Sequence, residues 1–139
     1  MAAKVLDSWA LIALFEDEPA ADAVENLLHQ ATLERQKLFL SVVNWGEIYY
    51  NTMREVSQEA AEQQAREIAS LPIEIVGVAD DLHLARQAAI YKATCKMSYA
   101  DCFGAALAKI KNAEFVTGDP EFKEVEKEIK INWLTAGRR

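Results

Sequence analysis

Four carboxylates stand where short apolar segments of the sequence give way to helical patterns. Asp7 follows KVL, Glu47 follows LSVVNWG, Asp101 heads the segment DCFGAALAKI, and Asp119 follows EFVTG. The carboxyl ends of parallel strands and the beginnings of the helices that follow them face one crevice, so acids far apart in sequence can meet there. We therefore expect these four side chains to share one site.

Carboxylates that meet need a cation, and this requirement predicts the chemistry of the site. Two unit charges about 4 Å apart repel by roughly 4 kcal/mol at an effective dielectric of about 20, and four acids contain several such pairs. Mg²⁺ or Mn²⁺ offsets this repulsion, because hard cations take oxygen ligands and keep several waters that substrate phosphates can displace. The four acids thus predict a divalent-metal site that acts on phosphate groups.

Taken singly, each acid also fits an ordinary helix cap. Ser98 and Asp101 fit a capping box, Asp119 precedes a proline at a first helical position, and Asp7 can cap the helix that follows it. The segment NWGE, which ends at Glu47, is a looser version of the same signal. The joint arrangement of the four acids favours a metal site over four separate caps.

The elements that must position these acids are predicted by short apolar runs that alternate with helical patterns. The runs are rich in β-branched or aromatic residues and lie at Lys4–Leu6, Leu38–Val43, Ile73–Val78, Glu114–Thr117 and Ile129–Leu134. Such an alternation is typical of an α/β fold, with a mostly parallel sheet of about five strands that helices cover on both faces.

Two helical segments have a special place in this prediction. The helix that carries Asp101 has a stripe of apolar and small residues, which includes Gly104 and would let the helix lie close to the sheet. The segment 44–70 predicts two successive helices, separated at Ser57, that stand above the sheet as a helical clip. Tyr49, Tyr50 and Met53 give this clip apolar and aromatic side chains, which either pack in the core or form an exposed interaction patch.

Length and composition indicate one globular domain over residues 1–139. Hydrophobic residues make up 51% of the chain, which has only 5 Gly and 3 Pro. No apolar run reaches the roughly 18 residues of a membrane span, and no signal segment is recognisable, so we expect a cytoplasmic protein without a membrane partner. Cys95 and Cys102 have neither CxxC nor metal-ligand spacing, and we expect both to be reduced. The net charge of −7 means that contact with a polynucleotide must depend on metal and on local basic residues.

With these residues in place, the chain resembles a PIN domain and, within that superfamily, a VapC-type toxin of a toxin–antitoxin pair. The resemblance extends over essentially the whole length and rests on four segments in order: KVLDSWALIALFEDEP, SVVNWGEIYY, MSYADCFGAALAK and FVTGDPEFKEVE. PIN domains are Mg²⁺- or Mn²⁺-dependent nucleases, and VapC toxins act on RNA. The resemblance therefore implies an endoribonuclease with an RNA substrate and a cognate antitoxin. It also implies a homodimer, for which Ile48, Tyr49, Tyr50 and the apolar residues near Leu84 offer a surface.

The same resemblance assigns site residues. The acidic quartet of the family falls on Asp7, Glu47, Asp101 and Asp119, and its hydroxyl near the last acid falls on Thr117. Asp7, Asp101 and Asp119 are the expected metal ligands, with Asp7 and Asp101 as the main ones. Asp119 and Glu47 would hold metal-bound water or a second ion, and Thr117 would orient a water. The metal would lower the pKa of a bound water and offset charge on the scissile phosphate during in-line attack.

Three further positions complete the comparison with the family pattern. Ser8 matches the small polar residue just after the first acid, and Ser98 occupies the polar position before the third. Trp9 departs from the pattern, because many members have a small hydroxyl residue there. A contact between residue 9 and metal-bound water is therefore not expected in this chain.

Other classes of protein fit the sequence less well. A phosphohydrolase of the haloacid-dehalogenase type needs a second Asp two residues after the first, where this chain has Trp9. A phosphoacceptor receiver domain needs an acidic pair at the first strand, and Asp7 has no acidic neighbour. The alternative that remains is a non-catalytic PIN fold that binds RNA or protein. A metal-dependent cleavage assay separates it from the enzyme.

Overall fold

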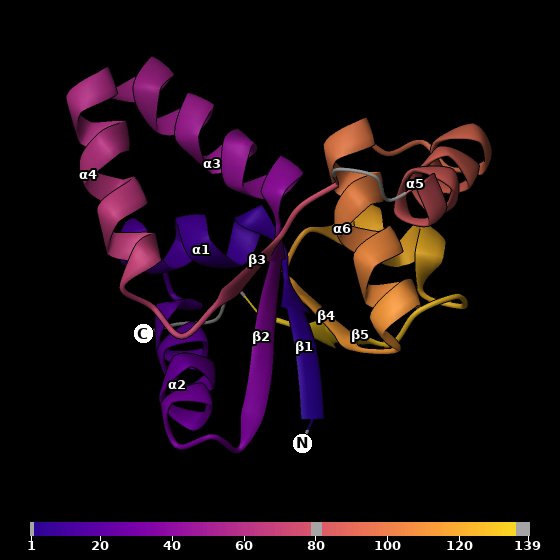
Figure 1. The fold of residues 1–139 in the computed structure, drawn as a ribbon, viewed down its shortest axis with the longest axis horizontal. Coiled ribbons are helices and arrows are strands. Elements are labelled where there is room, and N and C mark those ends of the chain that lie inside the picture. The colour runs from indigo at the N-terminus through magenta and orange to yellow at the C-terminus, as the bar shows by residue number, and fades with distance from the viewer. Residues whose placement is uncertain (1, 79–81, 136–139) are drawn as a thin grey trace.

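A computed structural model describes residues 2–78 and 82–135 as an α/β domain around one parallel sheet. The strand order is β3-β2-β1-β4-β5, with β1 in the centre (Figure 1). All neighbouring strands pair in parallel, as the sequence predicts. The strands are β1 (Ala2–Leu6), β2 (Gln36–Ser41), β3 (Glu74–Val76), β4 (Glu114–Thr117) and β5 (Ile131–Trp133).

The topology creates one switch point in the sheet. From the central strand β1 the chain adds β2 and then β3 on one side, whereas β4 and β5 lie on the other side. At such a reversal of strand order, the connections that leave the two central strands diverge and open a crevice beyond their carboxyl ends. Asp7 directly follows β1, and Gly118 and Asp119 directly follow β4.

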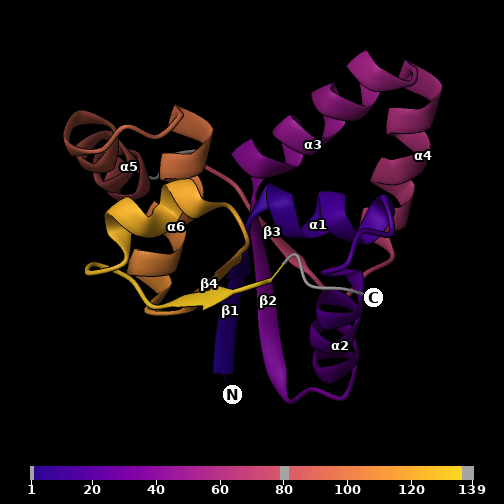
Figure 2. The same cartoon turned by 180° about the vertical axis from the view of Figure 1, so that it is seen from behind.

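Helices cover both faces of this sheet (Figures 1 and 2). They are α1 (Ser8–Phe15), α2 (Ala21–Thr32), α3 (Val42–Glu55), α4 (Gln58–Ala69), α5 (Leu82–Thr94), α6 (Tyr99–Lys111) and a 3₁₀ helix, η1 (Pro120–Val125). In β1, Val5 packs into the core shared with α5, α6 and η1, and Leu6 packs into the core shared with α1 and α2. Both side chains are fully buried, as expected for a parallel sheet that is covered on both faces.

The predicted helical clip is present as the pair α3 and α4, which projects beyond the sheet in both views (Figures 1 and 2). Ser57 caps α4 by accepting a hydrogen bond of 3.0 Å from the amide of Ala60. Of the predicted interaction residues, Tyr50 and Met53 are exposed. Ile48 is only 1% exposed, so the prediction that it belongs to a dimer surface is wrong. Near Leu84, which is itself buried, Leu82 is exposed.

The other differences from the predicted elements lie at their ends. β2 ends at Ser41, not at residue 43, because the Ser41 hydroxyl accepts a hydrogen bond from the amide of Val43 and caps α3. β3 has three residues, fewer than the predicted Ile73–Val78, since it is an edge strand that pairs only with residues 39–41 of β2. β5 is likewise shorter than predicted.

Two further expectations can be compared with the part of the chain that the structure describes. None of its helices is long and apolar enough to cross a membrane. Cys95 and Cys102 are both free thiols, as the spacing predicts. Burial raises the pKa of the Cys102 thiol to about 11, so this side chain is a weak nucleophile.

Candidate metal centre

The first acid of the predicted site, Asp7, is buried where β1 and β4 meet. Its side chain is 1% exposed. It occupies the N-cap position of α1 but makes no side-chain capping bond. Instead, Oδ2 of Asp7 accepts a hydrogen bond of 2.8 Å from Oγ1 of Thr117, and the amide of Asp7 donates to the carbonyl of Val116. The carboxylate is therefore held by β4 and is not a helix cap.

Glu47 is brought to Asp7 by two polar side chains on neighbouring helices. Oγ of Ser8 donates to Oε1 of Glu47 at 2.6 Å and lies 3.5 Å from Oδ1 of Asp7. Nδ2 of Asn44 lies 3.4 Å from the same Glu47 oxygen and donates to the carbonyl of Ala100 at 3.1 Å. Asn44 is fully buried and inside α3, so the NWGE segment does not cap this helix. Its amide links α3 to the beginning of α6.

Asp101 lies in the first turn of α6 and is 8% exposed. Ser98 caps this helix as predicted, with Oγ accepting a hydrogen bond of 3.1 Å from the amide of Asp101. Gly104 allows α6 to approach α3 and β4 closely. A Cβ atom at Gly104 would lie 2.9 Å from Oδ1 of Asn44 and 3.0 Å from Cε1 of Phe115. The small residue thus holds Asp101 over the strand ends, as the sequence pattern predicts.

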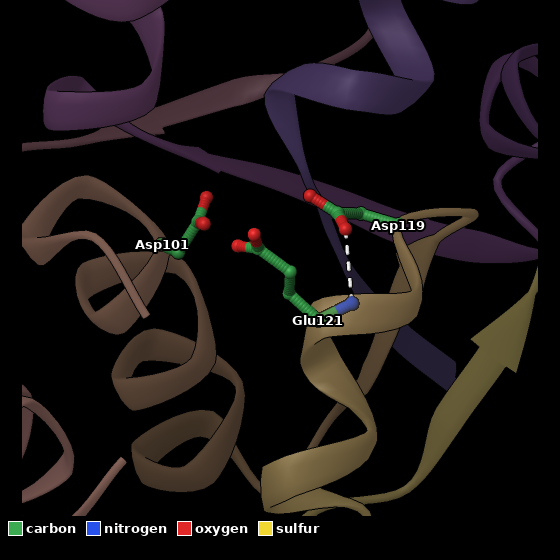
Figure 3. A group of neighbouring side chains, drawn as sticks. All are labelled: Asp101, Asp119 and Glu121. Atoms are coloured by element: carbon green, nitrogen blue, oxygen red, sulfur yellow. Dashed lines mark hydrogen bonds between the residues drawn. The ribbon is translucent and has the colours of Figure 1, made fainter. Parts of the chain in front are cut away.

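Asp119 caps η1, whose first residue is the expected proline. Its Oδ1 accepts a hydrogen bond of 2.9 Å from the amide of Glu121, and its own amide donates to Oγ1 of Thr117 at 3.0 Å. One carboxylate oxygen each from Asp101, Asp119 and Glu121 lie within 4.8 Å of one another. Figure 3 shows these side chains converging between α6 and η1. Such a group could hold a metal ion.

Glu121 is a site residue that the sequence reasoning missed. It is exposed and belongs to the first turn of η1, two residues after Asp119. The available signal was the second acid of the segment GDPEF. The spacing of Glu121 from Asp119 in the sequence does not by itself show that Glu121 faces α6, because that depends on how η1 packs in the fold. The structure provides this arrangement.

The electrostatics of the cluster show that Asp7 and Asp101 each lie within range of other acids. Burial raises the pKa of Asp7 well above its usual range, the Thr117 hydrogen bond opposes this shift, and the charges of Asp101, Glu47 and Asp119 add to it. Burial also raises the pKa of Asp101 to about 6. Glu47, Asp119 and Glu121 add to that shift, and a hydrogen bond with Ser98 opposes it.

No lysine or arginine within residues 2–78 and 82–135 forms an ion pair with these five carboxylates. The donor set consists of carboxylate oxygens with hydroxyls behind them, which is the set that Mg²⁺ and Mn²⁺ favour. The residues therefore fit a hard divalent cation.

Two cavities of about 400 and 420 Å³ lie elsewhere, one at the amino ends of β1 and β4 and one beside β2 and β3.

The chain is similar to a known protein family over most of its length. The model of the family "PIN domain" matches residues 4–128, a range that contains all five acids of the cluster. A search of curated proteins finds no match.

Solved structures with a similar fold include toxin–antitoxin proteins. VapBC2 from Rickettsia felis, bound to a DNA fragment from its promoter, has a TM-score of 0.73 at 16% identity, covering 96% of this chain and 99% of that chain. DNA-bound VapBC from Salmonella typhimurium has a TM-score of 0.71 at 18% identity, covering 97% and 100%. VapC20 from Mycobacterium tuberculosis, a Sarcin-Ricin loop cleaving toxin, has a TM-score of 0.68 at 17% identity, covering 98% and 99%. At these identities the likeness shows the fold.

Proposed function

This chain belongs to the PIN domain family, and we propose on that basis that it is a Mg²⁺- or Mn²⁺-dependent endoribonuclease that hydrolyses phosphodiester bonds in RNA. The observation that carries the proposal is the meeting of five carboxylates beyond the ends of β1 and β4, where no lysine or arginine of the described residues pairs with them. Such a group costs free energy in the absence of an external cation.

In the proposed site, Asp7, Asp101 and Asp119 hold the metal together with Glu121, whose carboxylate lies close to those of Asp101 and Asp119. Glu47 lies beside them. A bound divalent ion would lower the pKa of the attacking water and would offset charge on the scissile phosphate. The raised pKa values of Asp7 and Asp101 mean that these side chains hold protons at higher pH than ordinary acids. Metal uptake should therefore release protons, and metal affinity should rise with pH.

Thr117 has a more definite role in the structure than the water-orienting role expected from the sequence. Its hydroxyl donates its single proton to Oδ2 of Asp7 and accepts the amide hydrogen of Asp119. We therefore assign to Thr117 the positioning of both acids. Ser8 has the corresponding position on the other side of Asp7, with its proton donated to Glu47.

The biological role that we propose is the toxin of a toxin–antitoxin pair in the cytoplasm. The support is the fold, which solved VapBC complexes share. An acidic site is also a favourable place for a guanidinium, which binds carboxylates through a planar fork. An antitoxin could insert such a cation while its apolar side chains cover Tyr50, Met53 and Val56, which are exposed at the end of α3. A homodimer remains part of this proposal.

The test is cleavage of a mixed-sequence single-stranded RNA by the purified protein with Mg²⁺, with Mn²⁺, and with excess chelator. Asp101→Asn, purified in the same way, controls for contaminating nuclease. We expect cleavage with metal only, and a loss in Asp101→Asn larger than the roughly 10–100-fold that removal of an outer-shell partner costs. Equal cleavage in chelator would refute the metal mechanism. RNA binding without cleavage in any metal would favour the alternative, a non-catalytic binding module.

A further inference from the structure

A close contact between α1 and the end of β4 lies beside the carboxylates. The indole of Trp9 covers Gly118, the residue between Thr117 and Asp119. A Cβ atom at Gly118 would lie 2.4 Å from Cη2, 2.6 Å from Cζ3 and 2.7 Å from Cζ2 of Trp9. Real Cβ atoms essentially never come closer than 3.0 Å to another heavy atom. Only glycine therefore fits at position 118 while the indole keeps its place.

The backbone of Gly118 does not by itself require glycine. No glycine in the described ranges has a positive φ angle, so Gly118 has a conformation open to other residues. At Gly46 and Gly77, by contrast, a Cβ atom would have no heavy atom within 4 Å. The need for glycine at position 118 therefore comes from Trp9.

This contact connects the parts of the chain that carry the site acids. Trp9 lies in the first turn of α1, two residues after Asp7, and its partly buried ring packs against the core of α1 and α2. Gly118 is flanked by Thr117, which donates to Asp7, and by Asp119, whose amide donates to Thr117. The ring thus lies against the backbone between Thr117 and Asp119, two residues of the proposed metal centre.

We infer that Trp9 is a positioning residue. Its indole fixes the backbone of residues 117–119 against α1 and thereby sets the position of the Asp119 carboxylate, and Gly118 provides the space for the ring. This inference rests on the proposed function, because it assigns Asp119 to the metal. Trp9 acts through its shape, at a position where a small hydroxyl was expected from the family pattern. The hydrogen bonds of Asp119 to Thr117 and Glu121 fix it to β4 and η1, whereas the indole fixes this unit to α1.

The inference predicts that positions 9 and 118 depend on each other. In Gly118→Ala, the new methyl group and the indole cannot both keep their places, so the backbone of residues 117–119 must shift. Trp9→Ser removes the three atoms that lie nearest to the methyl position at residue 118. We therefore expect Gly118→Ala to be harmful in the wild-type background and nearly neutral in the Trp9→Ser background.

The experiment compares wild type, Trp9→Ser, Gly118→Ala and the double variant, with Gly46→Ala as a matched glycine substitution in open space. Two quantities are measured on the full chain: the urea midpoint of unfolding, and the Mn²⁺ dissociation constant from calorimetric titration. We expect Gly118→Ala and Trp9→Ser each to weaken Mn²⁺ binding by about 10–100-fold, the usual effect of losing an outer-shell partner. Trp9→Phe, which keeps an aromatic ring, should recover part of the loss. Gly46→Ala should bind Mn²⁺ as wild type does.

Each result has a definite meaning. Trp9→Ser that binds Mn²⁺ like wild type but unfolds at lower urea would show that the ring serves packing alone, and would overturn the inference. An equal effect of Gly118→Ala in both backgrounds would overturn the dependence on Trp9. If Gly118→Ala does not fold while the double variant does, the steric dependence is supported. Wild-type protein that takes up no Mn²⁺ would instead refute the proposed metal centre, and the urea midpoints would still decide whether the two positions are coupled.

Discussion

Carboxylates at the two ends of the paired strands β1 and β4 have pKa shifts of opposite direction. At the amino ends, Lys4 and Glu114 are register partners. Nζ of Lys4 lies 2.6 Å from the Glu114 carboxylate, and Lys130 approaches its other oxygen at 3.3 Å. The hydrogen bond from Lys4 lowers the pKa of Glu114. At the carboxyl ends, Asp7 is buried beside Thr117 and near three other acids, and its pKa is raised.

This difference separates an acid that stabilises the fold from acids that are suited to bind a cation. The chain supplies two lysines to Glu114, Lys4 and Lys130. It supplies none to Asp7, Glu47, Asp101 or Asp119 among the described residues, although burial makes an unpaired charge costly there. Among the described residues, the buried acids Asp7 and Asp101 both lie at this end of the sheet, which is the pattern expected of a functional site.

The largest expected effect is on RNA cleavage, and it should be confined to one end of the sheet. Asp7→Asn keeps the size of the side chain and removes its charge, so cleavage should fall by more than about 100-fold. Glu114→Gln, the matched amide substitution at the other end, should cleave at close to the wild-type rate. Single-turnover rates on one labelled RNA with Mg²⁺ measure both. Equal losses in the two variants would remove the distinction between the ends.

A smaller effect concerns the stability of the metal-free protein. The folded-state pKa of Asp101 is about 6, above its usual value of 3.8. Between these values the native state binds more protons than the unfolded state, so stability falls as pH rises through this window. Asp101→Asn removes this loss. In chelator near pH 7, the variant should be more stable than wild type by about 1 kcal/mol, because the loss of a negative charge in the first turn of α6 offsets part of the gain.

Urea unfolding near pH 7 and near pH 4 measures this difference. It should shrink toward the lower pH, because near pH 4 the Asp101 carboxyl is protonated in the folded state and about half protonated in the unfolded state, whose pKa is the usual 3.8. A variant that is less stable than wild type near pH 7 would indicate that Asp101 stabilises the fold without a metal, contrary to the electrostatics of the cluster.

The smallest effect is at the opposite end and has the opposite sign. The pKa of Glu114 is lowered, so its stabilisation is present above the usual value of 4.5 and is lost as pH falls through the folded-state pKa. Glu114→Gln should therefore be less stable than wild type near pH 7, by about 0.5 kcal/mol because the pair is partly exposed. The same urea experiment measures it. A stabilised Glu114→Gln would contradict the contrast between the ends.

The parts of the molecule that the sequence predicted are those set by local patterns. Apolar runs end where β1 and β4 end, so Asp7 and Asp119 are found directly beyond them. Ser98 and Asp119 cap helices because their side chains reach amides two or three residues away. These features depend on neighbours in the sequence, which the pattern of residue types contains.

The parts that could not be predicted depend on contacts between distant segments. Glu121 joins the acids because η1 packs opposite α6. In the sequence, Trp9 is only a departure from the family pattern, since its contact with Gly118 forms when β1 and β4 pair. The sequence places Ile48 on an interaction surface, but the packing of α3 buries it. A helical pattern shows that a residue is apolar without showing which surface covers it.

The most direct test of the account is the titration of the carboxyl groups of Asp7, Asp101 and Glu114 by ¹³C NMR, in chelator and with saturating Mg²⁺. Without metal, we predict that Asp7 and Asp101 titrate above the usual aspartate range and that Glu114 titrates below the usual glutamate value. Mg²⁺ should lower the pKa of both aspartates, because a nearby cation favours the charged form, and should leave Glu114 unchanged. Aspartates that titrate at ordinary values, with no response to Mg²⁺, would contradict the claim that this end of the sheet is a metal centre.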